Sequence, residues 1–227
     1  MRNLRNAYTT AAACVALGLW ACPVQATVIT GNGGFEIAGS GGAADSDMWS
    51  EFTTAANNVS ERTTTNPEFG SYAHHLLAYG QDALGTVAGI QQNSGNDVGL
   101  PSLAPGSTLS ASFDAMTPFG PGGVMNYTLR ILNGAGAIVN IYNNTIPNPS
   151  SVYNTYTTTS LIVPAFGAAP NDYYVAFFEI NAAAGGFASS VSEIYVDNVS
   201  IEGTLVPEPA SLALLALGAA AVTRRRR

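Results

Sequence analysis

The chain has 227 residues, contains no lysine and carries a formal net charge of −7 at pH 7. Six of its eight arginines lie near the two ends, so the body from Thr27 to Val206 has only Arg62 and Arg130 against fourteen acidic residues, a net charge of −12. Such a surface repels phosphate backbones and anionic lipid, which excludes nucleic acid as a partner of the body.

The N-terminal segment has the three parts of a secretory signal peptide: two arginines, a short apolar run and a small-x-small site that ends at Ala26. We therefore predict that residues 1–26 form a signal helix that is removed on export. A lipid-attachment motif that ends at Cys22 is an alternative, which Trp20 fits poorly. Both cysteines, Cys14 and Cys22, lie in this leader, so the exported chain has neither a disulfide nor a thiol.

Residues 27–203 form the predicted folded body, which is long enough for one domain with a hydrophobic core. Strand-like segments recur along it, separated by turn residues, and no long stretch has helical periodicity. In Ser107–Met116 the apolar residues alternate with polar ones, as in a half-buried strand. Tyr173–Ile180 is apolar on both faces, as expected of a central strand that is covered on both sides, and Asn133-Gly134 predicts a hairpin turn.

Ten strands are predicted in the body, and together they indicate an all-β fold, a β-sandwich of the jelly-roll type. In chain order they are Val28–Ile37, Met48–Thr53, Ser71–Tyr79, Thr86–Gln92, Ser107–Met116, Met125–Ile131, Ala137–Tyr142, Thr155–Val163, Tyr173–Ile180 and Val191–Ile201.

The C-terminal tail, residues 204–227, contains the motif Val206-Pro207-Glu208-Pro209, an apolar run from Ala210 to Val222 and four terminal arginines. As a helix the run of 13 residues covers roughly 20 Å, less than the ~30 Å of a bilayer core. The tail is therefore predicted to associate with a membrane only transiently. A weak single-span anchor is the alternative.

The motif, the apolar run and the arginine cluster together resemble the PEP-CTERM sorting signal. The resemblance implies recognition and removal of the tail by an exosortase-type membrane protease. It also implies a protein of a Gram-negative, exopolysaccharide-producing bacterium, which passes the inner membrane and is secreted or held at the cell surface.

Two segments near the ends of the body, Asn32-Gly33-Gly34-Phe35-Glu36 and Ile194–Ile201, resemble the two ends of carbohydrate-binding-module jelly rolls. Such folds often hold a structural Ca²⁺ there, and the matching carboxylates in this chain are Glu36 and Asp197. Asp197 shares a predicted strand face with Val199 and Ile201, so it is expected to point inward. A buried carboxylate needs either a cation or several hydrogen-bond donors, and both explanations stay open.

Phe119 and Trp49 are the predicted ligand contacts, because sugar binding uses flat aromatic faces beside a few polar groups. Phe119 lies in a segment rich in Gly and Pro that offers little core to bury it, and Trp49 is the only tryptophan outside the leader. His74 and His75 are adjacent, so on a strand they point to opposite faces and do not share a metal.

The body has no motif of a serine hydrolase, a zinc protease or a dinucleotide-binding enzyme. We therefore predict that it is not an enzyme but a secreted protein that associates with extracellular polysaccharide or the cell surface. A matrix or adhesion protein without a specific sugar ligand is the first alternative. A glycan-active enzyme that uses two carboxylates is the second.

Overall fold

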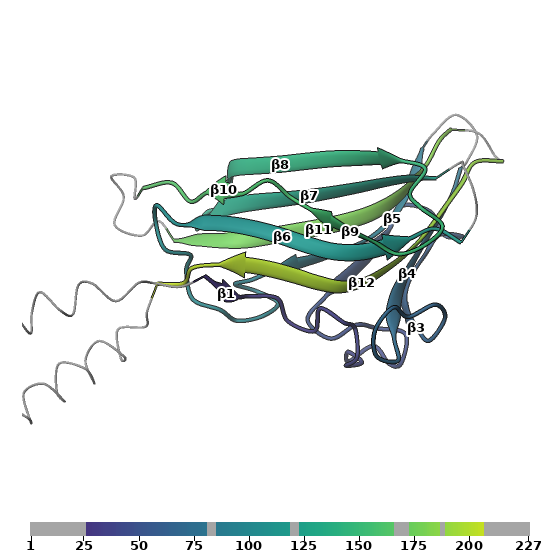
Figure 1. Cartoon of the computed structure of the whole chain (residues 1–227), viewed down its shortest axis with the longest axis horizontal. Helices are drawn as coiled ribbons and strands as arrows, with labels where there is room; N and C mark the ends of the chain where they lie inside the picture. The colour runs from purple at the N-terminus through teal and green to yellow at the C-terminus, as the bar shows by residue number, and fades with distance from the viewer. Residues whose placement is uncertain (1–25, 81–84, 119–122, 166–172, 187–188, 207–227) are drawn as a thin grey trace, which may run out of the picture.

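The computed structural model describes residues 26–80, 85–118, 123–165, 173–186 and 189–206. These residues form two antiparallel β-sheets packed face to face, and they contain no helix (Figure 1). The predicted all-β sandwich is therefore confirmed. Within the same residues, no helix is long and apolar enough to cross a membrane. The predicted signal helix and C-terminal helix lie outside the described residues.

The larger sheet has seven strands. Its central order is β10 (Leu161–Ile162), β6 (Thr108–Met116), β12 (Val191–Gly203), β4 (Ala73–Tyr79) and β3 (Val59–Thr63). Two short strands extend it, because β1 (Thr27–Val28) pairs with β12 and β9 (Asn154–Thr157) pairs with β6.

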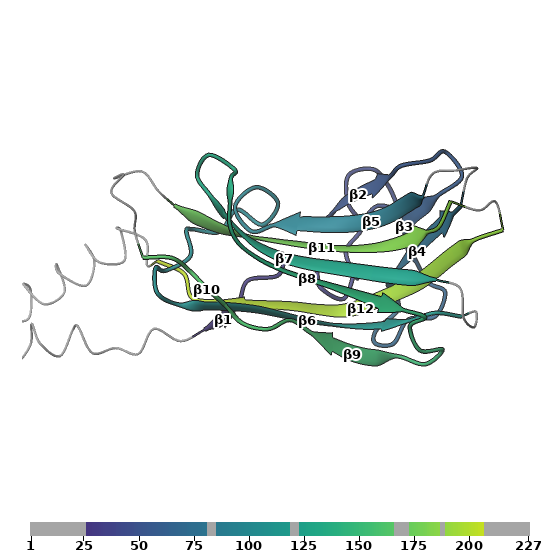
Figure 2. The same cartoon turned by 90° about the horizontal axis from the view of Figure 1, so that it is seen from above.

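The smaller sheet has five strands, in the order β2 (Ser50–Thr53), β5 (Thr86–Asn93), β11 (Tyr174–Ala184), β7 (Val124–Asn133) and β8 (Ile138–Pro147). Strand β11 pairs with β5 on one side and with β7 on the other, so its predicted central position is confirmed. The prediction that both of its faces are covered is wrong, because among the described residues the larger sheet packs only on its inner face, with Ala176 and Phe178. Seen from above, the two sheets form the two layers of the sandwich (Figure 2).

The hydrophobic core lies between the sheets and is built from alternate residues of each strand. In β6 the predicted inner residues Leu109, Ala111, Phe113 and Ala115 are all at most 4% exposed, so the predicted alternation is confirmed. Phe113 lies at the centre of an aromatic cluster with three rings from other strands: Tyr127, Tyr156 and Phe178.

Two predicted strands differ in extent from the observed ones. The segment predicted as Val28–Ile37 is a strand only at Thr27–Val28, because Asn32 and Phe35 adopt positive φ angles of 48° and 56° that an extended strand does not allow. The predicted strand Thr155–Val163 is split into β9 and β10, which pair with different parts of β6.

The sequence prediction missed β3 entirely and ended β8 too early. The sequence of β3, Val-Ser-Glu-Arg-Thr, has one apolar residue, so it carries no alternating signal. Strand β8 continues to Pro147 through a segment rich in Asn and Thr, and it pairs with β7 along its whole length. Pairing with a neighbour, rather than local preference, makes both segments strands.

Both ends of the described chain leave from the same end of the sandwich, because Thr27 pairs with Gly203 (Figure 1). The folded chain also extends beyond the predicted boundary at residue 203. Leu205 forms a bridge with Leu103, and the N–H of Val206 donates to the carbonyl oxygen of Ser102 at 2.8 Å. The sorting motif therefore begins directly at the edge of the folded body.

Candidate functional site

Rows of side chains cross the outer face of the five-stranded sheet, which we call the polar face. Strand residues alternate between the core and this face, and the strand register aligns the outward residues of neighbouring strands. Amides and hydroxyls supply most of its polar groups. The polar and aromatic members of the polar face are Ser50, Phe52, Gln91, Asn93, Asn126, Thr128, Arg130, Asn143, Thr145, Phe177, Glu179 and Asn181, and the register also places the apolar residues Val87, Leu132, Ile141 and Val175 on it.

A chain of side-chain hydrogen bonds runs across three strands of the polar face. Thr145 Oγ1 on β8 donates to Asn126 Oδ1 on β7 at 2.8 Å. Asn126 Nδ2 donates to Asn181 Oδ1 on β11 at 3.0 Å, and Asn181 Nδ2 donates to Glu179 Oε1 at 3.0 Å. These bonds set the orientation of the two amides, of which Asn126 is half-buried and Asn181 is 9% exposed.

An ion pair lies beside this chain of hydrogen bonds. Arg130 Nη2 is 3.3 Å from Glu179 Oε2, and the two side chains are 27% and 17% exposed. The guanidinium also lies over the ring of Phe177, 5.1 Å from its centroid, which is a cation–π distance. Nε of Arg130 is buried without a hydrogen-bond partner among the described residues. The one cation of the polar face is thus already neutralised within the protein.

A glycine brings an aromatic ring onto the edge of the polar face. The half-buried ring of Phe52 lies across Gly89 of the neighbouring strand, where an added Cβ would be 2.4 Å from Phe52 Cζ and 2.8 Å from the Cβ of Asn181. A larger residue at Gly89 would displace the ring. The amides of the polar face are thus flanked by the rings of Phe52 and Phe177.

A hollow of about 310 Å³ extends the polar face at one end of the sheet. Its aromatic wall is Tyr173, which is 51% exposed and lies against Gly134; an added Cβ there would be 2.7 Å from Tyr173 Cε1. Asn93 belongs to both the hollow and the polar face. The other lining residues are Gly95, Asn96, Leu100, Ser102, Leu132, Asn133, Gly136 and Val175. The amide oxygens of Asn93 and Asn133 each accept two backbone N–H groups of their own turns, so these two side chains also hold the shape of the hollow.

Of the two aromatic residues predicted to contact a ligand, Trp49 is a core residue. It is 6% exposed, packs against Phe35 with ring centroids 5.4 Å apart, and donates its indole N–H to the carbonyl oxygens of Gly31 and Asn32. Neither face of its ring is free for stacking, and it is not part of the polar face. Phe119 lies outside the described residues.

The prediction that Asp197 points inward with the apolar residues after it is wrong. The register of β12 against β6 shifts directly after Asp197, and Asn198 has a φ angle of 49°, so a bulge reverses the alternation there. Val196 before the bulge and Val199 after it both belong to the core. Asp197 therefore lies on the outer face of the larger sheet, opposite Asp114 of β6.

Asp197 is nevertheless fully buried, because the loop before β4 covers it. Its Oδ2 accepts the N–H groups of Glu68 and Phe69, both at 3.0 Å, and its Oδ1 accepts the N–H of Asn198 at 2.7 Å. Burial raises the pKa of the Asp197 carboxyl above its usual range, while these three N–H groups act in the opposite direction. The carboxylate thus fastens the loop onto β12.

Glu36, the other predicted calcium ligand, fastens the same loop. Its Oε1 accepts the N–H groups of Ser71 at 2.8 Å and Tyr72 at 3.1 Å. A Cβ added at Gly34 would lie 3.9 Å from both Asp197 Oδ1 and Glu36 Cγ, so the two side chains flank one glycine. Among the described residues, no group of three or more His, Cys, Asp or Glu side chains is placed to hold a metal. Hydrogen bonds explain the burial of Asp197 without a cation, and calcium stays a prediction.

The adjacent histidines point to opposite faces of β4. His74 is fully buried, with Nδ1 3.0 Å from Ser46 Oγ and Nε2 3.0 Å from Ser60 Oγ. His75 lies on the outer face, stacked on Tyr195 with ring centroids 4.7 Å apart, and its Nε2 is 2.9 Å from Glu193 Oε1. The two rings do not share a metal.

The buried His74 predicts a loss of stability in acid. Burial lowers its pKa from 6.5 to about 3, so between these values the unfolded chain binds a proton that the folded chain does not. His74 makes its full contribution to the free energy of unfolding above pH 6.5. This contribution falls by up to about 1.4 kcal/mol per pH unit as the pH decreases towards 3. Burial raises the pKa of Glu51 to about 7. Partial desolvation and the neighbouring Asp114 and Asp197 raise the pKa of Glu68, an exposed residue, to about 7. These two carboxyls act in the opposite direction between pH 4.5 and 7.

Comparison with His74→Gln isolates the histidine, because both proteins keep the two glutamates. Chemical denaturation from pH 7.5 to 4 should show that the free energy of unfolding falls more steeply with decreasing pH in the wild type than in His74→Gln. If the free energies of the two proteins fall in parallel, His74 is not neutral and buried.

Residues 205–227 match the PEP-CTERM protein-sorting motif. The chain carries a PEP-CTERM sorting signal. This signal indicates export and cell-surface sorting in a bacterium and implies processing by an exosortase, as the tail sequence predicts. Of the predicted motif, Val206 is bonded to the folded body, and Pro207, Glu208 and Pro209 lie outside the described residues.

No curated protein matches this PEP-CTERM chain in sequence. Among solved structures, it is similar to the active domain of tailspike protein 4 of bacteriophage CBA120, with TM-score 0.50 and 18% identity over 78% of this chain and 21% of that one. A cyclase from Fischerella sp. TAU is similar over 81% of this chain and all of that one, with TM-score 0.53 and 17% identity. The CBM22-1 xylan-binding domain of Paenibacillus barcinonensis Xyn10C has TM-score 0.48 and 8% identity, over 82% and 100%.

These likenesses show the fold alone, because each of the three chains is less than 25% identical to this one. This chain spans about a fifth of the tailspike chain.

The sequence prediction missed the polar face, although part of its signal is visible in the sequence. Asn126, Thr128 and Arg130 alternate with apolar residues along β7, and Glu179 and Asn181 interrupt the apolar run of β11. Polar residues within a central strand mark a face that is not covered by a second layer. The sequence alone does not tell which strands lie next to each other.

Proposed function

We propose that the exported protein binds extracellular polysaccharide without catalysis, through the polar face and the hollow beside it. One observation carries this proposal: the oriented amides of Asn126 and Asn181 share the outer face of the five-stranded sheet with the aromatic rings of Phe52 and Phe177, and Tyr173 lies at the end of the row. Oriented amides exchange hydrogen bonds with hydroxyl groups, and aromatic rings cover the apolar faces of sugar rings.

The sorting signal supports the place of action. We propose that the cell is Gram-negative, that the tail is processed at the inner membrane, and that the body then remains in the polysaccharide outside the cell. The body's net charge of −12 agrees with a protein that does not adhere to anionic lipid or nucleic acid.

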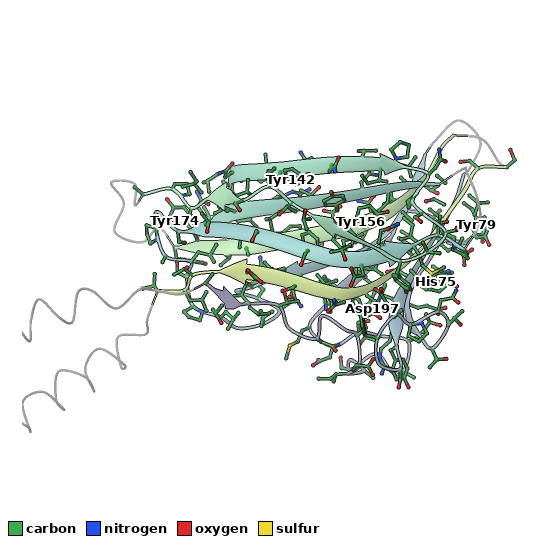
Figure 3. The ribbon with its side chains drawn as sticks, in the orientation of Figure 1. His75, Tyr79, Tyr142, Tyr156, Tyr174 and Asp197 are labelled. Atoms are coloured by element: carbon green, nitrogen blue, oxygen red, sulfur yellow. The ribbon has the colours of Figure 1, made fainter. Side chains whose placement is uncertain are left out.

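The test is affinity electrophoresis of the exported protein in gels that contain the extracellular polysaccharide of the producing cell. Wild-type protein should be retarded, and Tyr173→Ala and Phe177→Ala should each weaken binding about tenfold, or about 1.4 kcal/mol, through the loss of one aromatic contact. Tyr79→Ala is the matched control, because Tyr79 is 39% exposed and lies at the opposite end of the sandwich from Tyr174 (Figure 3). Equal binding by all four proteins would remove the polar face from the proposal.

The two alternatives give different results in the same gels. A matrix or adhesion protein without a sugar ligand would not be retarded by any polysaccharide. A glycan-active enzyme would shorten the polysaccharide during incubation.

A further inference from the structure

We infer that the polar face takes an uncharged polysaccharide and rejects polymers that carry carboxylates, such as polyuronates. This inference rests on the proposed function and names the substrate class of the same site. It follows from where the few cations of the body lie and what each of them contacts.

The first arginine of the body is not available to any ligand. Arg62 is 7% exposed, and its guanidinium donates to the carbonyl oxygens of Phe35, Glu36 and Ala43. It also stacks on Tyr72, with Cζ 3.2 Å from the ring centroid. Its hydrogen bonds and its flat face are therefore used inside the fold.

The second arginine lies on the polar face but is neutralised there. Arg130 pairs with Glu179 at 3.3 Å, and both belong to neighbouring strands of the five-stranded sheet. Of the two histidines, His74 is buried with a lowered pKa, and His75 pairs with Glu193 on the other sheet. Because the body contains no lysine, the polar face has no cationic side chain without an acidic partner to receive a carboxylate.

An anionic polymer would therefore lose hydration without gaining a partner, and it would approach a body with a net charge of −12. An uncharged polymer meets a different surface. The remaining polar groups of the face are amides and hydroxyls, such as Gln91, Asn126, Thr145 and Asn181, which accept and donate to hydroxyl groups without a charge penalty.

The experiment compares neutral and charged probes in affinity electrophoresis with the full exported protein. Xylan, galactomannan and hydroxyethylcellulose are the neutral probes, and polygalacturonate and alginate are the charged ones. EDTA is present so that a divalent cation does not bridge two anions. We expect retardation by at least one neutral polymer and none by either polyuronate, at 20 and at 300 mM salt.

A charge variant tests the stated cause. Glu179→Gln removes the acidic partner of Arg130, while the new amide oxygen can still accept from Asn181. Retardation by polyuronate should therefore appear at 20 mM salt and exceed that of the wild type at least threefold. It should disappear at 300 mM salt, where the charges are screened. Glu202→Gln is the matched control: it adds the same charge at an exposed position of β12, on the other sheet, and should bind no polyuronate. Melting curves of both variants check that they are folded.

The outcomes separate this inference from the proposed function. Retardation of the wild type by a polyuronate and by no neutral polymer overturns the inference and leaves polysaccharide binding in place. Failure of Glu179→Gln to bind polyuronate overturns the role of the ion pair. Absence of retardation by every polymer, including the cell's own, overturns both proposals.

Discussion

Replacing the fully buried Asp197 by alanine is expected to lower the free energy of unfolding by about 3–4 kcal/mol, since it leaves three N–H groups, those of Glu68, Phe69 and Asn198, without their acceptor. For a domain of this size such a loss lowers the Tm by roughly 10 °C. The loop that these bonds hold onto β12 should also become accessible to proteases. Calorimetric melting and limited proteolysis measure the two effects.

Asp197→Asn separates the hydrogen bonds from the charge. Its amide keeps one acceptor oxygen, so we expect about half the loss seen with alanine. A change below 1 kcal/mol in Asp197→Ala would show that the loop is held by other contacts.

The calcium prediction is tested with the same wild-type protein. If Ca²⁺ joins Glu36 and Asp197, EGTA should lower the Tm of the wild type by several degrees, because a bound ion stabilises only the folded state. If the backbone N–H groups alone satisfy the two carboxylates, EGTA should leave the Tm unchanged. The hydrogen bonds of Asp197 and Glu36 favour the second result.

Replacing Phe113 by alanine is expected to cost about 3–5 kcal/mol, the range for loss of a buried phenylalanine ring. Phe113 is fully buried and contacts Tyr127 at 5.0 Å, Tyr156 at 5.5 Å and Phe178 at 5.8 Å between ring centroids. Tyr127 and Phe178 belong to the five-stranded sheet and Tyr156 belongs to β9 of the larger sheet, so the cavity would loosen the contact between the two layers. Denaturant unfolding measures the loss.

Two variants serve as controls for Phe113. Phe113→Leu keeps most of the volume and should cost less than about 1.5 kcal/mol. Phe69→Ala removes a ring that is 60% exposed and should change stability by less than about 0.5 kcal/mol. Equal effects of Phe113→Ala and Phe69→Ala would contradict the central position of Phe113 in the core.

The sequence by itself determined those features that depend on local composition and on the alternation of apolar and polar residues along a strand. The sorting signal is a contiguous string of residues, and the acidic character of the body is a count, so neither requires a structure. The inner face of β6 was predictable because Leu109 and Phe113 repeat at strand spacing. Segments without that repeat, such as β3, were not predictable, because their partner strand makes them strands.

Only the tertiary structure decided where the site lies. The bulge after Asp197 depends on the register between β12 and β6, and it moves this carboxylate from the predicted inner face to the outer one. The polar face joins Asn126 to Asn181, which are 55 residues apart and meet only because β7 and β11 pair. Strand order and register are set by packing between distant segments, so a reading of one segment at a time does not contain them.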